Sequence, residues 1–154
     1  FSEGLASYEG RWTQFQNIGF SPKPVDNHIP VWVGGHSQAA FKRTARFGDA
    51  FHSAFAPPAL LAEQWKTVES ECETIGRDSS DLSLTSLFRL NFDGGDLEQG
   101  EVGGSNEEVI DQVGQYSDAG LEHAAFFVLG RGTEGRLEAI QRFSEEIAPH
   151  FPAT

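Results

Sequence analysis

A pair of glycines followed by a histidine and a serine has the clearest chemical potential in this sequence. Gly34, Gly35, His36 and Ser37 come directly after an apolar run, and a segment with helical spacing follows them. Adjacent glycines let the backbone approach an anion closely, and a serine here caps the helix whose N-terminal N–H groups face that anion. The turn is therefore a candidate phosphate site. The alternative is a helix cap after an ordinary strand-to-helix turn.

A second candidate anion site lies near the end of the chain. Arg131 stands between two glycines after the last apolar run, and Arg136 follows about one helical turn later. A guanidinium group binds phosphate through two parallel N–H donors. Either arginine is a candidate for this contact, and a solvated arginine in a capped loop is the alternative.

The apolar run at 82–92 alternates between two faces, as a strand does. Leucine and phenylalanine dominate one face, whereas Arg89 and Asn91 lie on the other, near the end of the run. A buried arginine needs a partner. Arg89 is therefore either a site residue or one half of a structural ion pair.

Histidines offer acid–base or metal chemistry, and His52, at the end of the second apolar run, is the best placed of them. Its alternative role is that of a hydrogen-bonded core histidine. The histidines lack metal-ligand spacing and Cys72 is the single cysteine, so we expect no zinc site. A catalytic set cannot be assigned, because one sequence does not reveal spatial neighbours.

Four apolar runs position these residues, and each precedes a segment with helical spacing. The runs span 31–34, 49–53, 82–92 and 123–129. Ser105 and Glu108 form a capping box at the start of the third helical segment. This alternation predicts an α/β fold of four βα units around a parallel sheet.

Two parts of the chain stand outside this pattern. Residues 1–29 show weak periodicity, which predicts an irregular lead-in segment before the four units at 30–154. Residues 93–104 are acidic, glycine-rich and aperiodic, which indicates a solvated insertion or a mobile lid. Four units do not close a (β/α)8 barrel, which needs eight, and a doubly wound four-stranded sheet fits the pattern equally well.

The segments Pro30–Ser37 and Ala45–His52 resemble a known family. Luciferase-like flavin- or deazaflavin (F420)-dependent oxidoreductases carry a similar P-x-W-V-G-G-x-S run, followed by A-R-x-G-D-x-W/F-H. The resemblance continues to Glu146 and covers only the second half of such a protein. It implies the C-terminal half of a (β/α)8 TIM barrel, with this chain supplying strands five to eight.

The resemblance also implies FMN or coenzyme F420 as the cofactor, and the form of the glycine turn favours F420. In the family this turn lies against the cofactor, with the serine on the phosphate and the glycines in close backbone contact. The residues so implied to bind the cofactor are Gly34, Gly35, His36, Ser37 and one of Arg131 and Arg136. The residues that a barrel would direct into its lumen are His52, Arg89 and Asn91.

The function implied is that of the C-terminal portion of an oxidoreductase or monooxygenase that acts on a small molecule. Most acid–base residues of the family lie in the first half, so we expect the isolated chain to be inactive. The alternative is a non-catalytic half-barrel that binds a phosphorylated ligand and assembles with itself. Unpaired strand edges at 31–33 and 124–129 would promote such a homo-oligomer.

Composition excludes several partners. The formal net charge of −12 disfavours nucleic acid and anionic membranes. No apolar stretch approaches the length of a membrane span, no signal peptide is evident, and the single cysteine suits a reducing cytoplasm. The sequence has no methionine and begins at Phe1, so we expect a truncated chain or a partial gene product.

Overall fold

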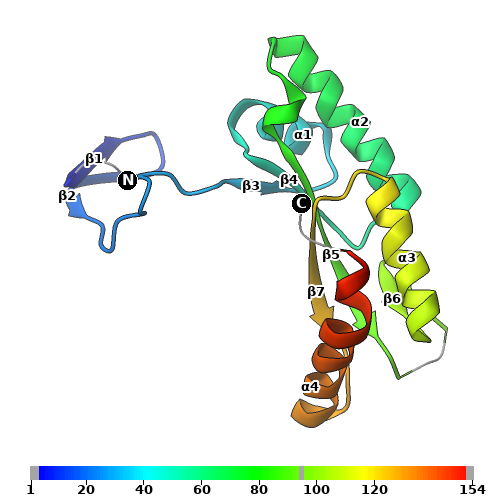
Figure 1. Ribbon diagram of the computed structural model, residues 1–154. Helices are drawn as coiled ribbons and strands as arrows, with labels where there is room; N and C mark the ends of the chain where they lie inside the picture. Colours follow the sequence, from blue (N-terminus) through cyan, green and yellow to red (C-terminus); the bar gives the residue numbers. More distant parts are fainter. Residues whose placement is uncertain (1–3, 94–95, 152–154) are drawn as a thin grey trace. The chain divides into compact units, whose positions relative to one another are not determined.

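The computed structural model describes residues 4–93 and 96–151, and the chain divides into two compact units, 1–30 and 31–154 (Figure 1). The first unit contains a β-hairpin. Its strands, β1 (Leu5–Glu9) and β2 (Gln14–Gly19), pair antiparallel.

The prediction of an irregular segment at 1–29 is wrong over this hairpin. Ala6 and Tyr8 of β1 are two residues apart, whereas their partners Ile18 and Phe15 in β2 are three apart, which marks a bulge in β2. A bulge inserts a residue and breaks the strict alternation of side chains. The apolar residues therefore lack the period of two by which a strand is identified in sequence.

The second unit is built on a parallel sheet of five strands (Figure 1). The strands are β3 (Trp32–Gly34), β4 (Ala50–Ala54), β5 (Ser83–Asn91), β6 (Glu101–Gly103) and β7 (His123–Val128). β5 is central: β4 and then β6 pair along one edge of it, and β7 pairs along the other. The predicted α/β fold with a parallel sheet is confirmed, and four of these strands coincide with the four apolar runs.

β6 was not predicted, because it lies in the stretch expected to be an insertion or a lid. It has three residues between acidic and glycine-rich flanks, which is too short to show an alternation. The side-chain amide of Gln112 replaces a neighbouring strand here, donating to the Gly103 carbonyl and accepting from the Gly103 N–H, both at 3.0 Å. Residues 94–95 of the predicted insertion lie outside the described residues.

The helices follow the strands in alternation, as predicted. They are α1 (Gln38–Phe47), α2 (Pro58–Ile75), α3 (Asn106–Asp118) and α4 (Gly132–Arg142). The capping box of α3 is confirmed: Ser105 accepts from the Glu108 N–H, and the Glu108 carboxylate accepts from the Ser105 N–H. No described helix is long and apolar enough to cross a membrane.

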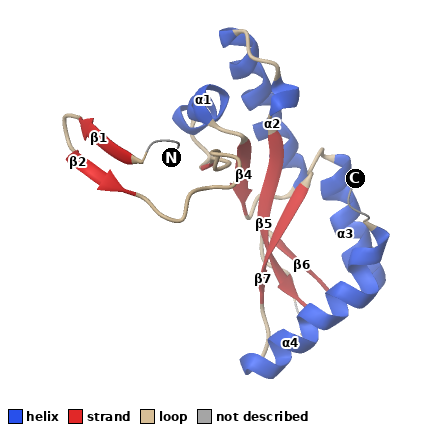
Figure 2. Ribbon diagram, turned by 60° about the vertical axis from the view of Figure 1, so that its left-hand side comes forward, coloured by secondary structure: helices blue, strands red, loops and turns tan. Residues whose placement is uncertain are grey.

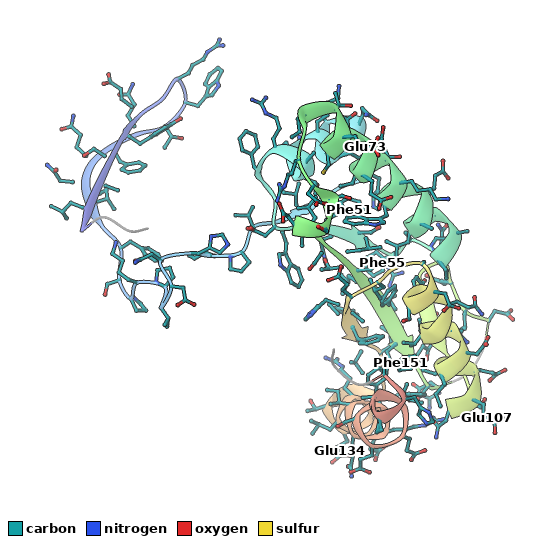
Figure 3. The ribbon with its side chains drawn as sticks, turned by 45° about the horizontal axis from the view of Figure 1, so that its top comes forward. Phe51, Phe55, Glu73, Glu107, Glu134 and Phe151 are labelled. Carbon is teal, nitrogen blue, oxygen red and sulfur yellow. The ribbon has the colours of Figure 1, made fainter. Side chains whose placement is uncertain are left out.

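The helices pack on one face of the sheet, and the core lies between the two layers (Figure 2). Phe51, Leu84, Phe88 and Leu90 point into this core and are fully buried. Acidic side chains such as Glu73 lie on the outer side of the helices (Figure 3).

The other face of the sheet has no helix on it within the described part of the second unit (Figure 2). Trp32 and Phe127 lie on this open face and are 45% and 60% exposed. The open face also carries Thr85 and Arg89, because side chains two residues apart share a face.

Candidate functional site

The turn at 34–37 lies where β3 ends and α1 begins, at the carboxyl edge of the sheet. Gly35 has φ +121°, which a residue with a Cβ rarely adopts, and a Cβ there would lie 3.1 Å from Ala40 Cβ. Ser37 is the N-cap residue of α1, and its Oγ accepts from the Ala40 N–H at 3.3 Å. The hydroxyl proton of Ser37 is not used in this bond. Capping and donation to a ligand oxygen are therefore compatible at one serine.

His36 points from this turn toward α2. Its Nδ1 lies 2.9 Å from Nε2 of Gln64, and Oε1 of Gln64 accepts from the Ser53 hydroxyl at 2.8 Å. Ser53 and Gln64 are both buried, whereas His36 is exposed. His36 and Gln64 also line a cavity of about 410 Å³ whose wall includes Phe55.

Ser53 and Gln64 were missed from the sequence. Gln64 lies on the buried stripe of α2, and Ser53 lies on the core face of β4. Both are polar residues at positions where the pattern calls for an apolar one. This was the signal that could have found them, since a polar residue that replaces a core residue needs a hydrogen-bond partner.

His52 lies on the open face, in register with Gly34 on one side and Thr85 on the other. Its Nδ1 lies 2.8 Å from Thr85 Oγ1, whose own proton goes to the Phe51 carbonyl at 3.0 Å. Nδ1 of His52 is therefore the donor. Burial, and secondarily the nearby His123, lower the pKa of His52. The ring is neutral near pH 7, and among the described residues Nε2 has no hydrogen-bond partner.

Arg89 lies on the open face near the carboxyl end of β5. Its guanidinium stacks over the ring of Phe55, 4.1 Å from the centroid, and Figure 3 labels this phenylalanine just past the end of β4. No carboxylate of the described residues lies within ion-pair distance of it. A rise of about 3.3 Å per residue puts Arg89 about 13 Å along β5 from Thr85. Arg89 and His52 therefore do not form one site.

Replacing Arg89 with methionine is expected to lower the unfolding free energy by less than about 1 kcal/mol, because no ion pair is broken. Urea denaturation measures the change. Arg77→Met is the matched control, since the Arg77 guanidinium donates to the Ala45 carbonyl at 3.0 Å. Loss of that bond should cost about 1.5–3 kcal/mol. A larger loss for Arg89→Met than for the control would contradict the absence of an ion-pair partner.

The remaining sequence candidates lie apart from the 34–37 turn. Asn91 uses its side-chain oxygen locally, accepting from the Asp93 N–H at 3.1 Å. Arg131 is the N-cap residue of α4, and both Arg131 and Arg136 are exposed. β4 and β5 separate β3 from β7, so three strand spacings of about 4.8 Å set the two candidate anion sites at least about 14 Å apart. One phosphate group cannot contact both.

A protein-family model described as luciferase-like monooxygenase matches residues 1–93, which is more than half of the chain. The chain belongs to the luciferase-like monooxygenase family. No curated protein matches this member of the family in sequence.

Solved structures agree with this luciferase-like assignment at the level of the fold. An F420-dependent secondary alcohol dehydrogenase in complex with an F420-acetone adduct matches with a TM-score of 0.78 and 16% identity, over 98% of this chain and 57% of the other. The coenzyme F420 dependent tetrahydromethanopterin reductase from Methanopyrus kandleri matches with 0.75 and 13%, over 95% and 58%. The monooxygenase RslO1 from Streptomyces bottropensis matches with 0.71 and 14%, over 98% and 57%.

This luciferase-like chain thus spans somewhat more than half the length of these three structures. Among its described residues, no group of three or more histidine, cysteine, aspartate or glutamate side chains is placed to hold a metal ion. The described candidate residues offer hydrogen-bond donors at the 34–37 turn and positively charged side chains at Arg131 and Arg136, and both kinds of group can bind an anion.

Proposed function

We propose that the chain forms the C-terminal half of a (β/α)8 barrel in a flavin- or F420-dependent oxidoreductase of the luciferase-like family. In this proposal it contributes the phosphate-binding side of the cofactor site, and the complete enzyme acts on a small-molecule substrate. The observation that carries the proposal is the 34–37 turn, in which Gly35 at φ +121° and the N-cap Ser37 meet at the N-terminus of α1.

The arrangement of the sheet supports the half-barrel. β3, β4, β5 and β7 lie side by side in chain order, all parallel, and the described helices of this unit cover one face of the sheet (Figure 1). The interior of a (β/α)8 barrel is filled by side chains of the opposite face. Trp32 and Phe127 on the open face are the kind of large side chains that such an interior would bury.

The 34–37 turn fits a phosphate group. The N–H groups of the first turn of α1 point toward it, and the positive end of the helix dipole favours an anion there. Ser37 adds a hydroxyl donor, and the absence of a Cβ at Gly35 leaves the backbone accessible. The flavin or deazaflavin ring would supply the redox chemistry, while the residues of this chain bind and orient the cofactor.

F420 is the cofactor that we favour, with FMN as the other candidate. Two of the similar structures are described by their F420 dependence, and a third, a riboflavin lyase, is described with modified FMN. The second basic site at Arg131 and Arg136 lies too far away for the same phosphate, so we assign it to a separate anionic group of the ligand.

A second candidate function follows from the open face. A chain that exposes Trp32 and Phe127 on a sheet, and ends the sheet in β3 and β7, has apolar edges that a second copy can cover. The chain would then be a non-catalytic half-barrel that assembles with itself and binds a phosphorylated ligand. Sedimentation of the free chain as a dimer, without binding of FMN or F420, would favour this candidate.

Titration with F420 and with FMN, followed by cofactor fluorescence, tests the proposed site. Saturable binding is expected, and Ser37→Ala should weaken it about 10- to 100-fold, because a hydrogen bond to a charged group contributes about 1.5–3 kcal/mol. Ser105→Ala is the matched control: it removes the equivalent N-cap bond, also 3.3 Å long, from α3. The control should lose stability without losing affinity. Equal affinity in the wild type and Ser37→Ala would refute the assignment of Ser37.

A further inference from the structure

Three side chains from different elements form a continuous hydrogen-bonded series that ends at the 34–37 turn. Ser53 of β4 donates to Oε1 of Gln64 in α2 at 2.8 Å, and Nε2 of Gln64 lies 2.9 Å from Nδ1 of His36. Ser53 is fully buried and Gln64 is 6% exposed. The inner two members are thus shielded from water, while His36 reaches solvent.

The direction of this series follows from the chemistry of its groups. The Ser53 hydroxyl donates a hydrogen bond to the Gln64 oxygen, so the amide NH2 of Gln64 faces His36 and donates to Nδ1. A ring nitrogen that accepts a hydrogen bond carries no proton. In the neutral imidazole the proton therefore lies on Nε2, the nitrogen on the far side of the ring.

A buried glutamine on the core stripe of α2 has a cost that leucine would avoid. Moving an amide out of water is unfavourable unless its hydrogen bonds are replaced. Here the amide oxygen of Gln64 accepts a hydrogen bond from Ser53, which fixes the orientation of the amide. The amide NH2 donates to His36. The arrangement is therefore suited to setting the state of His36, which stands directly before Ser37 in the candidate phosphate turn.

We propose that Ser53 and Gln64 are positioning residues that hold His36 in the Nε2–H tautomer, so that His36 presents a fixed N–H donor to an anionic oxygen of the ligand bound at the turn. The assignment of the tautomer stands on the three side chains alone. The contact with the ligand rests on the proposed function of the turn. The donors would then be the α1 N-terminus, the Ser37 hydroxyl and His36 Nε2–H.

Nitrogen-15 NMR of the histidine rings, above the pH at which imidazole protonates, tests the tautomer without any ligand. The expected result is a pyridine-like Nδ1 and a pyrrole-like Nε2 in His36. Gln64→Glu should reverse the two signals, because a carboxylate beside Nδ1 can only accept a hydrogen bond and so favours the tautomer with the proton on Nδ1. Gln99→Glu is the matched control, since Gln99 lines the same cavity while the described partner of His36 is Gln64. It adds the same charge and should leave the tautomer unchanged.

Ser53→Ala keeps the test decisive if Gln64→Glu does not fold. Without the serine proton the amide can rotate, and His36 should show a mixture of both tautomers. A proton on Nδ1 in the wild type, or a His36 spectrum unchanged in both variants, would overturn the proposal.

The ligand arm separates this inference from the proposed function. If the wild type binds FMN or F420, Gln64→Glu should weaken binding at least about fivefold, because Nε2 would then present a lone pair to the anion. Binding that is unaffected by Gln64→Glu, with the tautomer reversed, would overturn the role of His36 as a donor to the ligand. Failure of the wild type to bind either cofactor would instead contradict the proposed function, and the NMR result would still decide the tautomer.

Discussion

Replacing Phe88 with alanine is expected to lower the unfolding free energy by about 3–5 kcal/mol, the range found when a buried phenylalanine is truncated. Phe88 lies at the centre of the core and is 1% exposed. Its ring packs against Tyr116 and Phe126, with centroids 4.2 and 5.7 Å away. Truncation leaves a cavity bounded by the rigid sheet and α3, and neither can collapse fully to fill it. Urea denaturation followed by far-ultraviolet circular dichroism measures the loss.

Phe127 is the matched control, because it is a phenylalanine of the neighbouring strand on the opposite face. It lies in register with Arg89 and is 60% exposed. Phe127→Ala should cost less than about 1 kcal/mol in a chain whose open face is uncovered. Similar losses for the two variants would show that the open face is buried in solution. That outcome would favour the self-assembling candidate.

The main strands of the sheet could be predicted because their residues obey a strong local rule. Leu84, Phe88 and Leu90 alternate with polar residues, and the structure places the apolar members in the core. The capping box at Ser105 is likewise a local signal, since its two partners are three residues apart. The strand alternation and the capping box both depend only on spacing along the chain, and that spacing can be read from a single sequence.

β6 and the hairpin could not be predicted, because neither shows the regular alternation of side chains by which a strand is identified in sequence. The three residues of β6 complete an edge of β5 that β4 leaves free after Ala54. The alternation of β2 is broken by its bulge. Neither leaves a period in the sequence that distinguishes it from a loop.

The candidate site was predicted only in part, because some of its contacts join neighbours in the sequence and others join distant residues. The turn at Gly35 and Ser37 follows from residue types in succession, and its geometry suits the predicted contact. The series that reaches His36 joins residues 17 and 28 positions away, so their partnership depends on how α2 packs on β4. Arg89 illustrates the converse case. The sequence indicated that Arg89 needs a partner. Its stacking on Phe55 depends on the positive φ of Phe55, which no local pattern in the sequence predicts.

The second large loss of stability is expected from a substitution at Gly100, which packs against the backbone turn at Phe55. Phe55 has φ +57°, and its N–H donates to the Leu87 carbonyl at 2.9 Å, while the Gly100 carbonyl accepts from the Arg89 N–H at 2.9 Å. The edge of β5 thus passes from β4 to β6 at the point where Phe55 and Gly100 meet. A Cβ at Gly100 would lie 2.4 Å from Phe55 Cα, a backbone atom held by its own hydrogen bond.

Gly100→Ala is therefore expected to lower the unfolding free energy by about 2–5 kcal/mol. Gly100 has φ +77°, a conformation that costs a residue with a Cβ about 1–2 kcal/mol, and relief of the clash adds about 1–3 kcal/mol. Urea denaturation measures the total. Hydrogen exchange locates it, because β6 must move from β5 and the Arg89 amide should then exchange faster, while amides paired with β7 keep their protection.

Gly114→Ala is the control for this substitution. Gly114 lies inside α3, and a Cβ there would meet no atom within 4 Å. Alanine is the better helix former by about 0.8–1 kcal/mol, so this variant should be more stable than the wild type. The same chemical change is thus expected to have opposite signs at the two glycines. A neutral Gly100→Ala would mean that Phe55 can relax out of its turn, and the stacked position of Arg89 would then not be a fixed feature of the open face.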